Sequence, residues 1–140
     1  MTTERSLVLV KPDGFRRGLT GEVLRRIETK GYRLVALNIL TPGTDLLAAH
    51  YAEHEGKPFY GKLMAFMSSG PVAAAVIEGE QCIAGFRSLA GPTDPTQAPP
   101  GSIRGDLGRD WGQGSVENIV HGSDSATSAG REIGLWFPRL

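Results

Sequence analysis

The stretch Ser6–Gly14 has the sequence SLVLVKPDG and contains the clearest strand signal near the start of the chain. Its first five residues include two leucines and two valines, a composition typical of a short buried β-strand. Lys11 interrupts the apolar run, and the Pro-Asp-Gly that follows it is typical of a turn. The stretch therefore predicts a buried strand that leads directly into a loop.

Outward from this stretch, strand-like and helix-like segments alternate. The helices expected from apolar spacing and capping residues are 20–31, 46–56 with Thr44 or Asp45 as its N-cap, 58–70, 80–91 and 125–137. The further strands expected from composition are 32–40, 72–79 and 116–122. A long loop rich in proline and glycine, residues 92–115, precedes the last strand. This order predicts a single domain over residues 1–140 with helices packed on a sheet, and leaves open a parallel sheet or a split βαβ arrangement.

The composition excludes several classes of protein. Among 140 residues, 40% are hydrophobic and 21% charged, which is typical of a globular chain and not of a disordered one. The 15 basic and 15 acidic residues cancel, so no overall positive field would attract nucleic acid or an anionic membrane. The single Cys82 cannot form an intrachain disulfide, and the run before Lys11 is too short for a signal peptide or a membrane span. We therefore expect a cytoplasmic protein that requires neither membrane nor nucleic acid.

One histidine stands among small polar residues in NIVHGSDS, Asn118–Ser125. A neutral imidazole is nucleophilic and can accept an acyl or phosphoryl group when its ring is held in place. Ser123 and Asp124 follow His121 closely, and Glu132 on the next predicted helix lies within folding reach. Taken alone, these residues also suit a strand-to-helix turn in which Ser123 or Asp124 caps the helix and His121 has no function.

Four side chains that can bind phosphate stand at predicted strand or helix ends, namely Lys11, Arg87, Thr93 and Arg104. Arginine binds phosphate through a planar fork, lysine as a point charge, and threonine through its hydroxyl. Together they suit a polyphosphate, although each alone would be an ordinary surface residue. The chain contains neither GxxxxGK[ST] nor GxGxxG, so neither of those glycine-rich loops would hold a nucleotide.

The segment HYAEH, His50–His54, indicates a competing function. It matches the H-x-x-E-H pattern of inverted zinc proteases, in which two histidines one helical turn apart bind Zn²⁺ and the glutamate acts as base. The pattern has only three fixed positions, and no third ligand is marked downstream. An amphipathic helix with solvated His50 and His54 is therefore the simpler interpretation, and a zinc hydrolase using His50, Glu53 and His54 stays an alternative.

Seven motifs occur in a fixed order between Leu7 and Phe137: LVLVKPDG, HYAEHEGKPF, SGPV, GPTDP, GSIRGD, NIVHGSDS and EIGLWF. Together they resemble nucleoside diphosphate kinases, and bacterial members most, because the chain stops at Leu140 without a long C-terminal extension. The resemblance implies an α/β (α+β) ferredoxin-like sandwich, a four-stranded antiparallel sheet covered by helices. It also implies ping-pong transfer of the γ-phosphate of a nucleoside triphosphate to a nucleoside diphosphate, through a phosphohistidine on His121.

The resemblance further implies roles for individual residues. The catalytic histidine would be supported by Tyr51, Ser123 and Glu132. The nucleotide-binding residues would be Lys11 and Asn118 at the sugar hydroxyl and phosphates, Arg87, Thr93 and Arg104 at the phosphates, and Phe59 stacked on the base. Mg²⁺ would be carried by the nucleotide phosphates with no metal ligand from the protein. His50 and His54 would then belong to the helix surface.

Residues 106–117, DLGRDWGQGSVE, form a longer segment than in most members of the family and include Trp111. This segment borders the nucleotide base in the family, so base packing and subunit contacts are left unassigned. The resemblance implies a homo-oligomer, either a tetramer or a hexamer. A module that binds nucleotide without catalysis, built on the same kind of sheet, is the non-enzymatic alternative.

Overall fold

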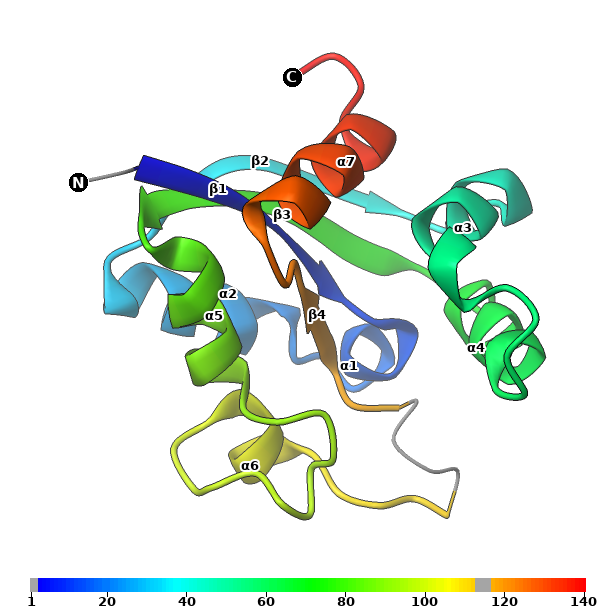
Figure 1. The fold of residues 1–140 in the computed structure, drawn as a ribbon. Coiled ribbons are helices and arrows are strands. Elements are labelled where there is room, and N and C mark those ends of the chain that lie inside the picture. The colour runs from blue at the N-terminus through cyan, green and yellow to red at the C-terminus, as the bar shows by residue number, and fades with distance from the viewer. Residues whose placement is uncertain (1–2, 113–116) are drawn as a thin grey trace.

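The computed structural model describes residues 3–112 and 117–140 (Figure 1). Its strands are β1 (Thr3–Val10), β2 (Arg33–Leu40), β3 (Val72–Glu80) and β4 (Val120–Gly122). Its helices are α1 (Pro12–Arg16), α2 (Thr20–Lys30), α3 (Thr44–His50), the 3₁₀ helix η1 (Ala52–His54), α4 (Tyr60–Met67), α5 (Cys82–Ala90), α6 (Ile103–Leu107) and α7 (Ala126–Trp136).

The strands form one sheet in the order β2-β3-β1-β4, and every neighbouring pair is antiparallel. The four-stranded antiparallel sheet expected from the sequence is therefore confirmed, and the parallel alternative is wrong. In the short pairing of β1 with β4, Leu9 lies opposite His121. The central strand thus places the histidine of NIVHGSDS beside the loop that contains Lys11.

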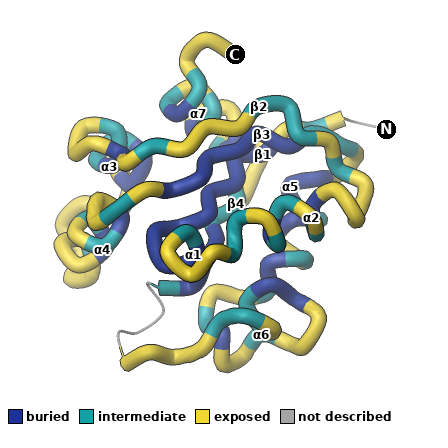
Figure 2. The backbone as a smooth tube through the Cα atoms, turned by 180° about the vertical axis from the view of Figure 1, so that it is seen from behind, coloured by how far each residue is buried: buried dark blue, intermediate teal, exposed yellow. Residues whose placement is uncertain are grey.

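Helices cover both faces of the sheet, which explains why the second half of β1, Leu7–Val10, is apolar without alternation. Leu7 and Leu9 pack with residues of α3, α4 and α7, whereas Val8 and Val10 pack with residues of α2, α5 and α6. Figure 2 shows β1 and β3 as buried strands and β2 as a largely exposed one. None of the helices in the described part of the chain combines the length and apolarity needed to cross a membrane.

Three local predictions are wrong. Residues 12–14, expected as a loop, begin α1, because proline is preorganised for the first turn of a helix. The long loop 92–115 contains α6, whose N-terminus is capped by Ser102 Oγ accepting the Gly105 N–H at 3.0 Å. The predicted strand 116–122 is a strand only over Val120–Gly122, and its first residue lies outside the described part of the chain.

Candidate active site

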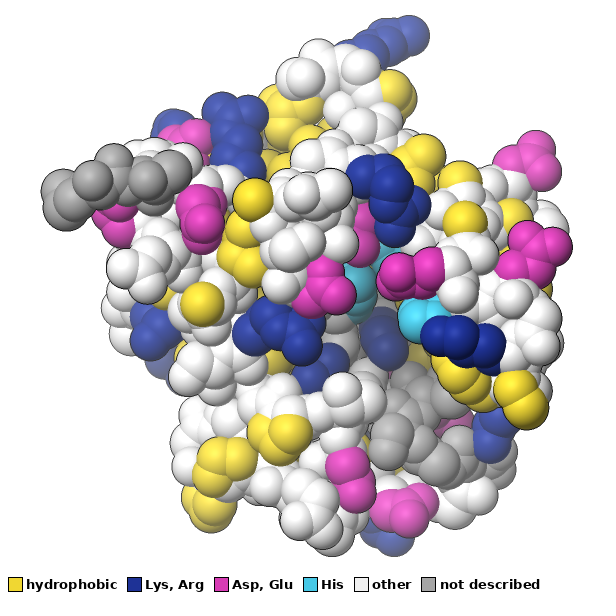
Figure 3. Space-filling model, viewed as in Figure 1, with side chains coloured by type: hydrophobic (Ala, Val, Ile, Leu, Met, Phe, Trp, Pro, Cys, Tyr) yellow, Lys and Arg dark blue, Asp and Glu magenta, His cyan; other side chains and the backbone are white. Residues whose placement is uncertain are grey.

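A cavity of about 970 Å³ opens where β4, the end of β1 and α5 meet. Its lining includes Tyr51, His121 and all six residues expected to bind nucleotide: Lys11, Phe59, Arg87, Thr93, Arg104 and Asn118. Figure 3 shows histidine side chains in a hollow of this face with basic side chains beside them. The fold therefore collects residues from five distant parts of the chain in one place.

His121 is held from behind by a buried carboxylate. Its Nε2 lies 3.1 Å from Oε1 of Glu132, which is on α7. The hydroxyl of Ser123 donates to the same oxygen at 2.8 Å and accepts the N–H of Leu7 at 3.1 Å. Glu132 is thus itself anchored to β1, and it fixes the plane and direction of the imidazole ring.

The charge state of Glu132 determines which nitrogen of His121 carries the proton. Burial alone would raise the pKa of Glu132, but hydrogen bonding and charge interaction with His121, together with the Ser123 hydroxyl, lower the pKa below its ordinary value. An ionised carboxylate only accepts hydrogen bonds, so Nε2 of His121 must be the donor. The lone pair of the neutral ring is therefore on Nδ1.

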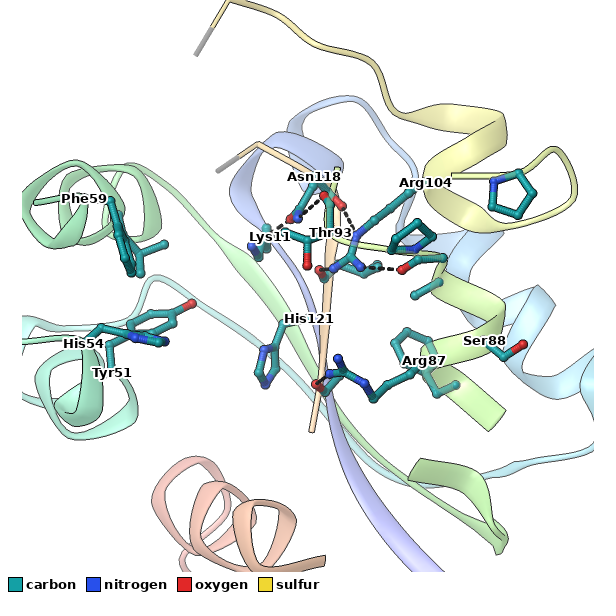
Figure 4. Close-up of a pocket in the computed structure, with 18 residues that line it drawn as sticks. Lys11, Tyr51, His54, Phe59, Arg87, Ser88, Thr93, Arg104, Asn118 and His121 are labelled. Carbon is teal, nitrogen blue, oxygen red and sulfur yellow. Dashed lines mark hydrogen bonds between the residues drawn. The ribbon is translucent and has the colours of Figure 1, made fainter. Parts of the chain in front are cut away.

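Asn118 connects two loops of the cavity. Its Oδ1 accepts a hydrogen bond from Nζ of Lys11 at 2.8 Å, and its Nδ2 donates to the carbonyl of Thr93 at 2.9 Å. Both bonds are drawn in Figure 4, where His121 lies between this group and the Tyr51, His54 and Phe59 side. The amide therefore fixes the separation of a cation and a loop that both face the cavity.

Arg104 donates from all three of its nitrogens to backbone carbonyls. Nε donates to Asn118 at 3.1 Å, Nη1 to Gly91 at 2.7 Å and Nη2 to Val120 at 2.6 Å. A guanidinium has five N–H groups, so two remain for a bound anion. Arg104 therefore supports the walls of the cavity as well as contributing charge to it.

The cavity concentrates positive charge that is poorly solvated. Burial, followed by repulsion from Arg104, lowers the pKa of Lys11 from 10.5 to about 8, although the nearby Asp13 opposes the shift. Burial, followed by repulsion from Arg87, lowers the pKa of Arg104 to about 10. Such cations are stabilised when an anion enters, so the cavity is suited to a phosphate chain.

The opposite wall of the cavity is aromatic. Phe59 is 42% exposed, and its ring centroid lies 5.3 Å from that of His54. Tyr51 is buried, which raises the pKa of its hydroxyl far above the ordinary value and keeps it neutral. An exposed ring face opposite a cationic wall can hold a base while the phosphates reach His121.

Comparisons with known proteins agree with this geometry. A family model described as nucleoside diphosphate kinase matches residues 4–140. The chain belongs to the nucleoside diphosphate kinase family. It is 59% identical to a nucleoside diphosphate kinase of Mycolicibacterium gilvum and 60% identical to one of Saccharopolyspora erythraea, each over 139 residues and 99% of both chains. The nucleoside diphosphate kinase of Halobacterium salinarum, solved in complex with CDP, has a TM-score of 0.91 and 46% identity, covering 97% of this chain and 88% of that one.

In this member of the nucleoside diphosphate kinase family, the alternative of a simple capped turn around His121 is wrong. The cap of α7 is Ser125, whose Oγ accepts the Ser128 N–H at 3.1 Å. Ser123 instead bonds to Glu132, and His121 faces the cavity. The sequence had offered Ser123 or Asp124 as the cap, so the predicted cap is wrong by one or two residues.

The expectation that His50 belongs to the helix surface is wrong. His50 is buried, its ring centroid lies 4.8 Å from that of His121, and its Nδ1 accepts the Nε1–H of Trp136 at 3.0 Å. Burial, followed by the neighbouring His121, lowers the pKa of His50 to about 3, so the ring is neutral. His50 follows the apolar Leu47 by three residues on the same helix, so the two share a helical face. That spacing was the sequence signal that His50 faces inward.

His54 is a cavity residue that sequence reasoning missed. It lines the cavity beside Phe59, and its Nδ1 lies 3.2 Å from Nζ of Lys57. The zinc interpretation of His50, Glu53 and His54 finds no support in this geometry, because His50 is buried against α7 while His54 faces the cavity. His50 groups instead with His121 and Glu132. Nδ1 of His50 already accepts the Trp136 N–H, so Nε2 of the same ring carries the proton, and a metal ion at His50 would have to displace one of the two.

The described residues of the longer segment 106–117 contact α2 and the residues just before it. Asp106 pairs with Arg26 at 2.9 Å, and the ring of Trp111 lies beneath Arg109 at 4.4 Å and Arg17 at 5.4 Å. Trp111 is not among the residues that line the cavity. Residues 113–116 of the segment lie outside the described part of the chain.

Proposed function

We propose that this chain is a nucleoside diphosphate kinase that moves the γ-phosphate of a nucleoside triphosphate to a nucleoside diphosphate through a phosphohistidine on His121. The observation that carries the mechanism is the bond from Nε2 of His121 to Glu132, which leaves the lone pair on Nδ1. Nδ1 is therefore the nitrogen that we assign as the nucleophile. A covalent intermediate lets one cavity serve first the donor and then the acceptor nucleotide.

In the first half-reaction, the Nδ1 lone pair attacks the γ-phosphorus, and the bond from that phosphorus to the β–γ bridging oxygen breaks. The bridging oxygen keeps the bonding electrons and leaves as part of the nucleoside diphosphate. The imidazole becomes cationic on phosphorylation, and Glu132 stabilises that charge through the Nε2 proton. The second half-reaction is the reverse, with a terminal oxygen of the acceptor diphosphate as the nucleophile.

Three cations would hold the phosphate chain in line with Nδ1. Arg104 offers its two remaining N–H groups, Arg87 reaches the cavity from the end of α5, and Lys11 offers an ammonium fixed by Asn118. Phosphoryl transfer depends mainly on positioning and on stabilising charge on the phosphoryl oxygens. Thr93 would add a hydroxyl, and its carbonyl already binds Asn118.

Phe59 would stack on the base. Its exposed ring offers a flat apolar face, and every nucleobase has a complementary π-face. Stacking without base-edge hydrogen bonds supports activity on several nucleotides. The partly exposed ring of His54 beside it would extend the same surface.

A divalent cation, Mg²⁺, fits this cavity as a companion of the nucleotide. The described residues that line the cavity include hydroxyl, amide and cationic groups but neither Asp nor Glu, whereas Mg²⁺ prefers oxygen ligands, waters and substrate phosphates. The phosphates would therefore hold the ion. When bound, it neutralises part of their charge.

We further propose that residues 1–140 form one domain that acts in the cytoplasm, where nucleotides are available, and assembles as a homo-oligomer. Edge strand β2 supports assembly with a second copy, because Leu37 and Ile39 are 48% and 56% exposed on it. An unpaired apolar edge can pair with the same edge of another subunit. Either a tetramer or a hexamer could contain such a pair.

The test is to incubate the protein with γ-labelled ATP in the absence of acceptor. We expect label on the protein that is stable in alkali, lost in acid, and transferred to added GDP. His121→Ala should abolish both labelling and exchange while its circular dichroism spectrum stays unchanged. Exchange without a phosphoenzyme would contradict the mechanism, and nucleotide binding without exchange would support the non-enzymatic module.

A further inference from the structure

The backbone two residues before His121 is strained. Ile119 has a φ of +75°, a region that β-branched residues rarely adopt. The N–H of Val120 donates to the carbonyl of Asn118 at 2.8 Å and closes a three-residue γ-turn around Ile119. Because the turn lies between Asn118 and His121, it determines how both side chains enter the cavity.

Lys11 and Asp13, at the junction of β1 and α1, hold both polar groups of the central residue of this turn. The N–H of Ile119 donates to Oδ2 of Asp13 at 3.0 Å, and the carbonyl of Ile119 accepts the N–H of Lys11 at 2.7 Å. Arg104 binds the carbonyls on either side of Ile119, those of Asn118 and Val120. The strained conformation is therefore fixed by contacts from two separate segments.

Asp13 occupies this position at a cost. It is buried, and among the described residues its second oxygen, Oδ1, has no hydrogen-bond partner. A buried carboxylate with an unpaired oxygen is unfavourable, and such a group calls for an explanation beyond packing. The other oxygen of the carboxylate accepts the N–H of the strained residue.

Gly14 permits the close contact between α1 and the turn. A Cβ at Gly14 would lie 2.9 Å from Cγ2 of Ile119, 3.0 Å from Cγ1 of Val10 and 3.2 Å from the carbonyl oxygen of Ile119. Any side chain there would push α1 away from the turn. The KPDG sequence thus supplies a backbone donor, a carboxylate acceptor and the space that brings both to Ile119.

We propose that Asp13 is a positioning residue for phosphoryl transfer, whose carboxylate holds the strained turn at Ile119 and thereby aims His121 at the γ-phosphorus. Asp13 does not line the cavity, so it acts through the backbone and not by contact with the nucleotide. The inference rests on the proposed function, because it requires His121 to be the phosphorylated residue.

The first measurement is the rate of phosphohistidine formation at saturating ATP. Asp13→Ala should slow this step by about 10- to 100-fold, the effect of a small misplacement of a reacting group. Asp13→Asn should retain most of the rate, because its amide oxygen can still accept the Ile119 N–H. The dissociation constant for ADP should change less than the rate in both variants.

A coupling experiment separates this role from general stabilisation. Ile119→Gly removes the penalty for positive φ, whereas Ile119→Ala removes nearly the same side-chain volume and keeps the penalty. Asp13→Ala should therefore cost much less rate when it is added to Ile119→Gly than when it is added to Ile119→Ala or to the unmodified chain.

Each outcome bears on the proposal. Equal costs of Asp13→Ala in all three backgrounds, or an unchanged rate in Asp13→Ala alone, would overturn it. If Asp13→Ala alone does not fold, the proposal requires the double variant with Ile119→Gly to regain the fold and part of the rate, and failure to do so counts against it. Absence of phosphoenzyme in the unmodified chain would instead overturn the proposed function.

Discussion

Replacing Lys11 by methionine should make the protein without nucleotide more stable and much less active. The ammonium of Lys11 is buried beside Arg104, and the hydrogen bond to Asn118 and the nearby Asp13 offset the loss of solvation only in part. Methionine keeps the length of the side chain without its charge. The same substitution removes a proposed phosphate contact, and removing one such preorganised donor lowers kcat by on the order of 100-fold.

The size of the stability change follows from the pKa of Lys11. The pKa falls from 10.5 to about 8, and each pKa unit corresponds to about 1.4 kcal/mol, so burying the charged amine costs about 3 kcal/mol. The substitution also leaves Oδ1 of Asn118 without its donor, which costs about 1 kcal/mol. We expect a net increase of about 2 kcal/mol in the free energy of unfolding at pH 7.

The effect should depend on pH with a defined sign. Between pH 8 and 10.5 the unfolded chain still binds the Lys11 proton whereas the folded chain has released it, so stability rises with pH. The destabilisation by Lys11 is thus complete below pH 8 and disappears toward pH 10.5. The stability difference between variant and unmodified protein should close over that window, because groups other than Lys11 contribute equally to both proteins.

Urea unfolding at a series of pH values measures both quantities. The exposed Lys30 at the end of α2 supplies a matched control, because Lys30→Met should change stability little and leave activity intact. Saturating ADP should stabilise the unmodified protein more than Lys11→Met. A Lys11→Met protein that is less stable than the parent at pH 7, or a stability difference that does not depend on pH, would refute the reasoning.

Three other substitutions test separate parts of the site. Glu132→Gln should slow phosphorylation by at least about 100-fold, since an amide can donate to Nε2 of His121 and move the ring proton to Nδ1. Rapid-quench labelling measures this rate, and an unchanged rate would contradict the assignment of the proton to Nε2. Phe59→Ala should raise KM about tenfold for ATP and GTP alike in steady-state assays, with kcat little changed; a rise confined to one base would argue against simple stacking. Leu37→Lys combined with Ile39→Lys on β2 should yield a smaller particle in size-exclusion chromatography with light scattering, and an unchanged mass would place the subunit contact elsewhere.

Most elements of the fold were predictable because apolar spacing reports which side of an element is buried. The run Leu7–Val10 and the helices after it followed from such patterns. The helix at Pro12 was not, because Pro-Asp-Gly is compatible with both a turn and the first turn of a helix. Packing against Ile119, far along the chain, stabilises the helical alternative.

The cavity residues were identified through motifs and not through periodicity. Lys11, Arg87, Thr93 and Arg104 were each ordinary as isolated residues, and the order of seven motifs made them a set. The structure adds that Arg104 directs its donors to backbone carbonyls, a role that its residue type alone does not reveal.

Local sequence was enough to specify the chemical groups and the elements that carry them, since spacing and residue type act over a few neighbours. Which residues form hydrogen bonds with one another was decided only by the folded chain. Lys11 donates to Asn118, 107 residues away, and the Leu7 N–H donates to Ser123, 116 residues away. The burial of His50 and the turn at Ile119 likewise depend on α7 and α1 returning to the sheet. Hydrogen bonds require partners within about 3 Å, and for residues so far apart only the antiparallel packing of β1 between β3 and β4 provides that approach.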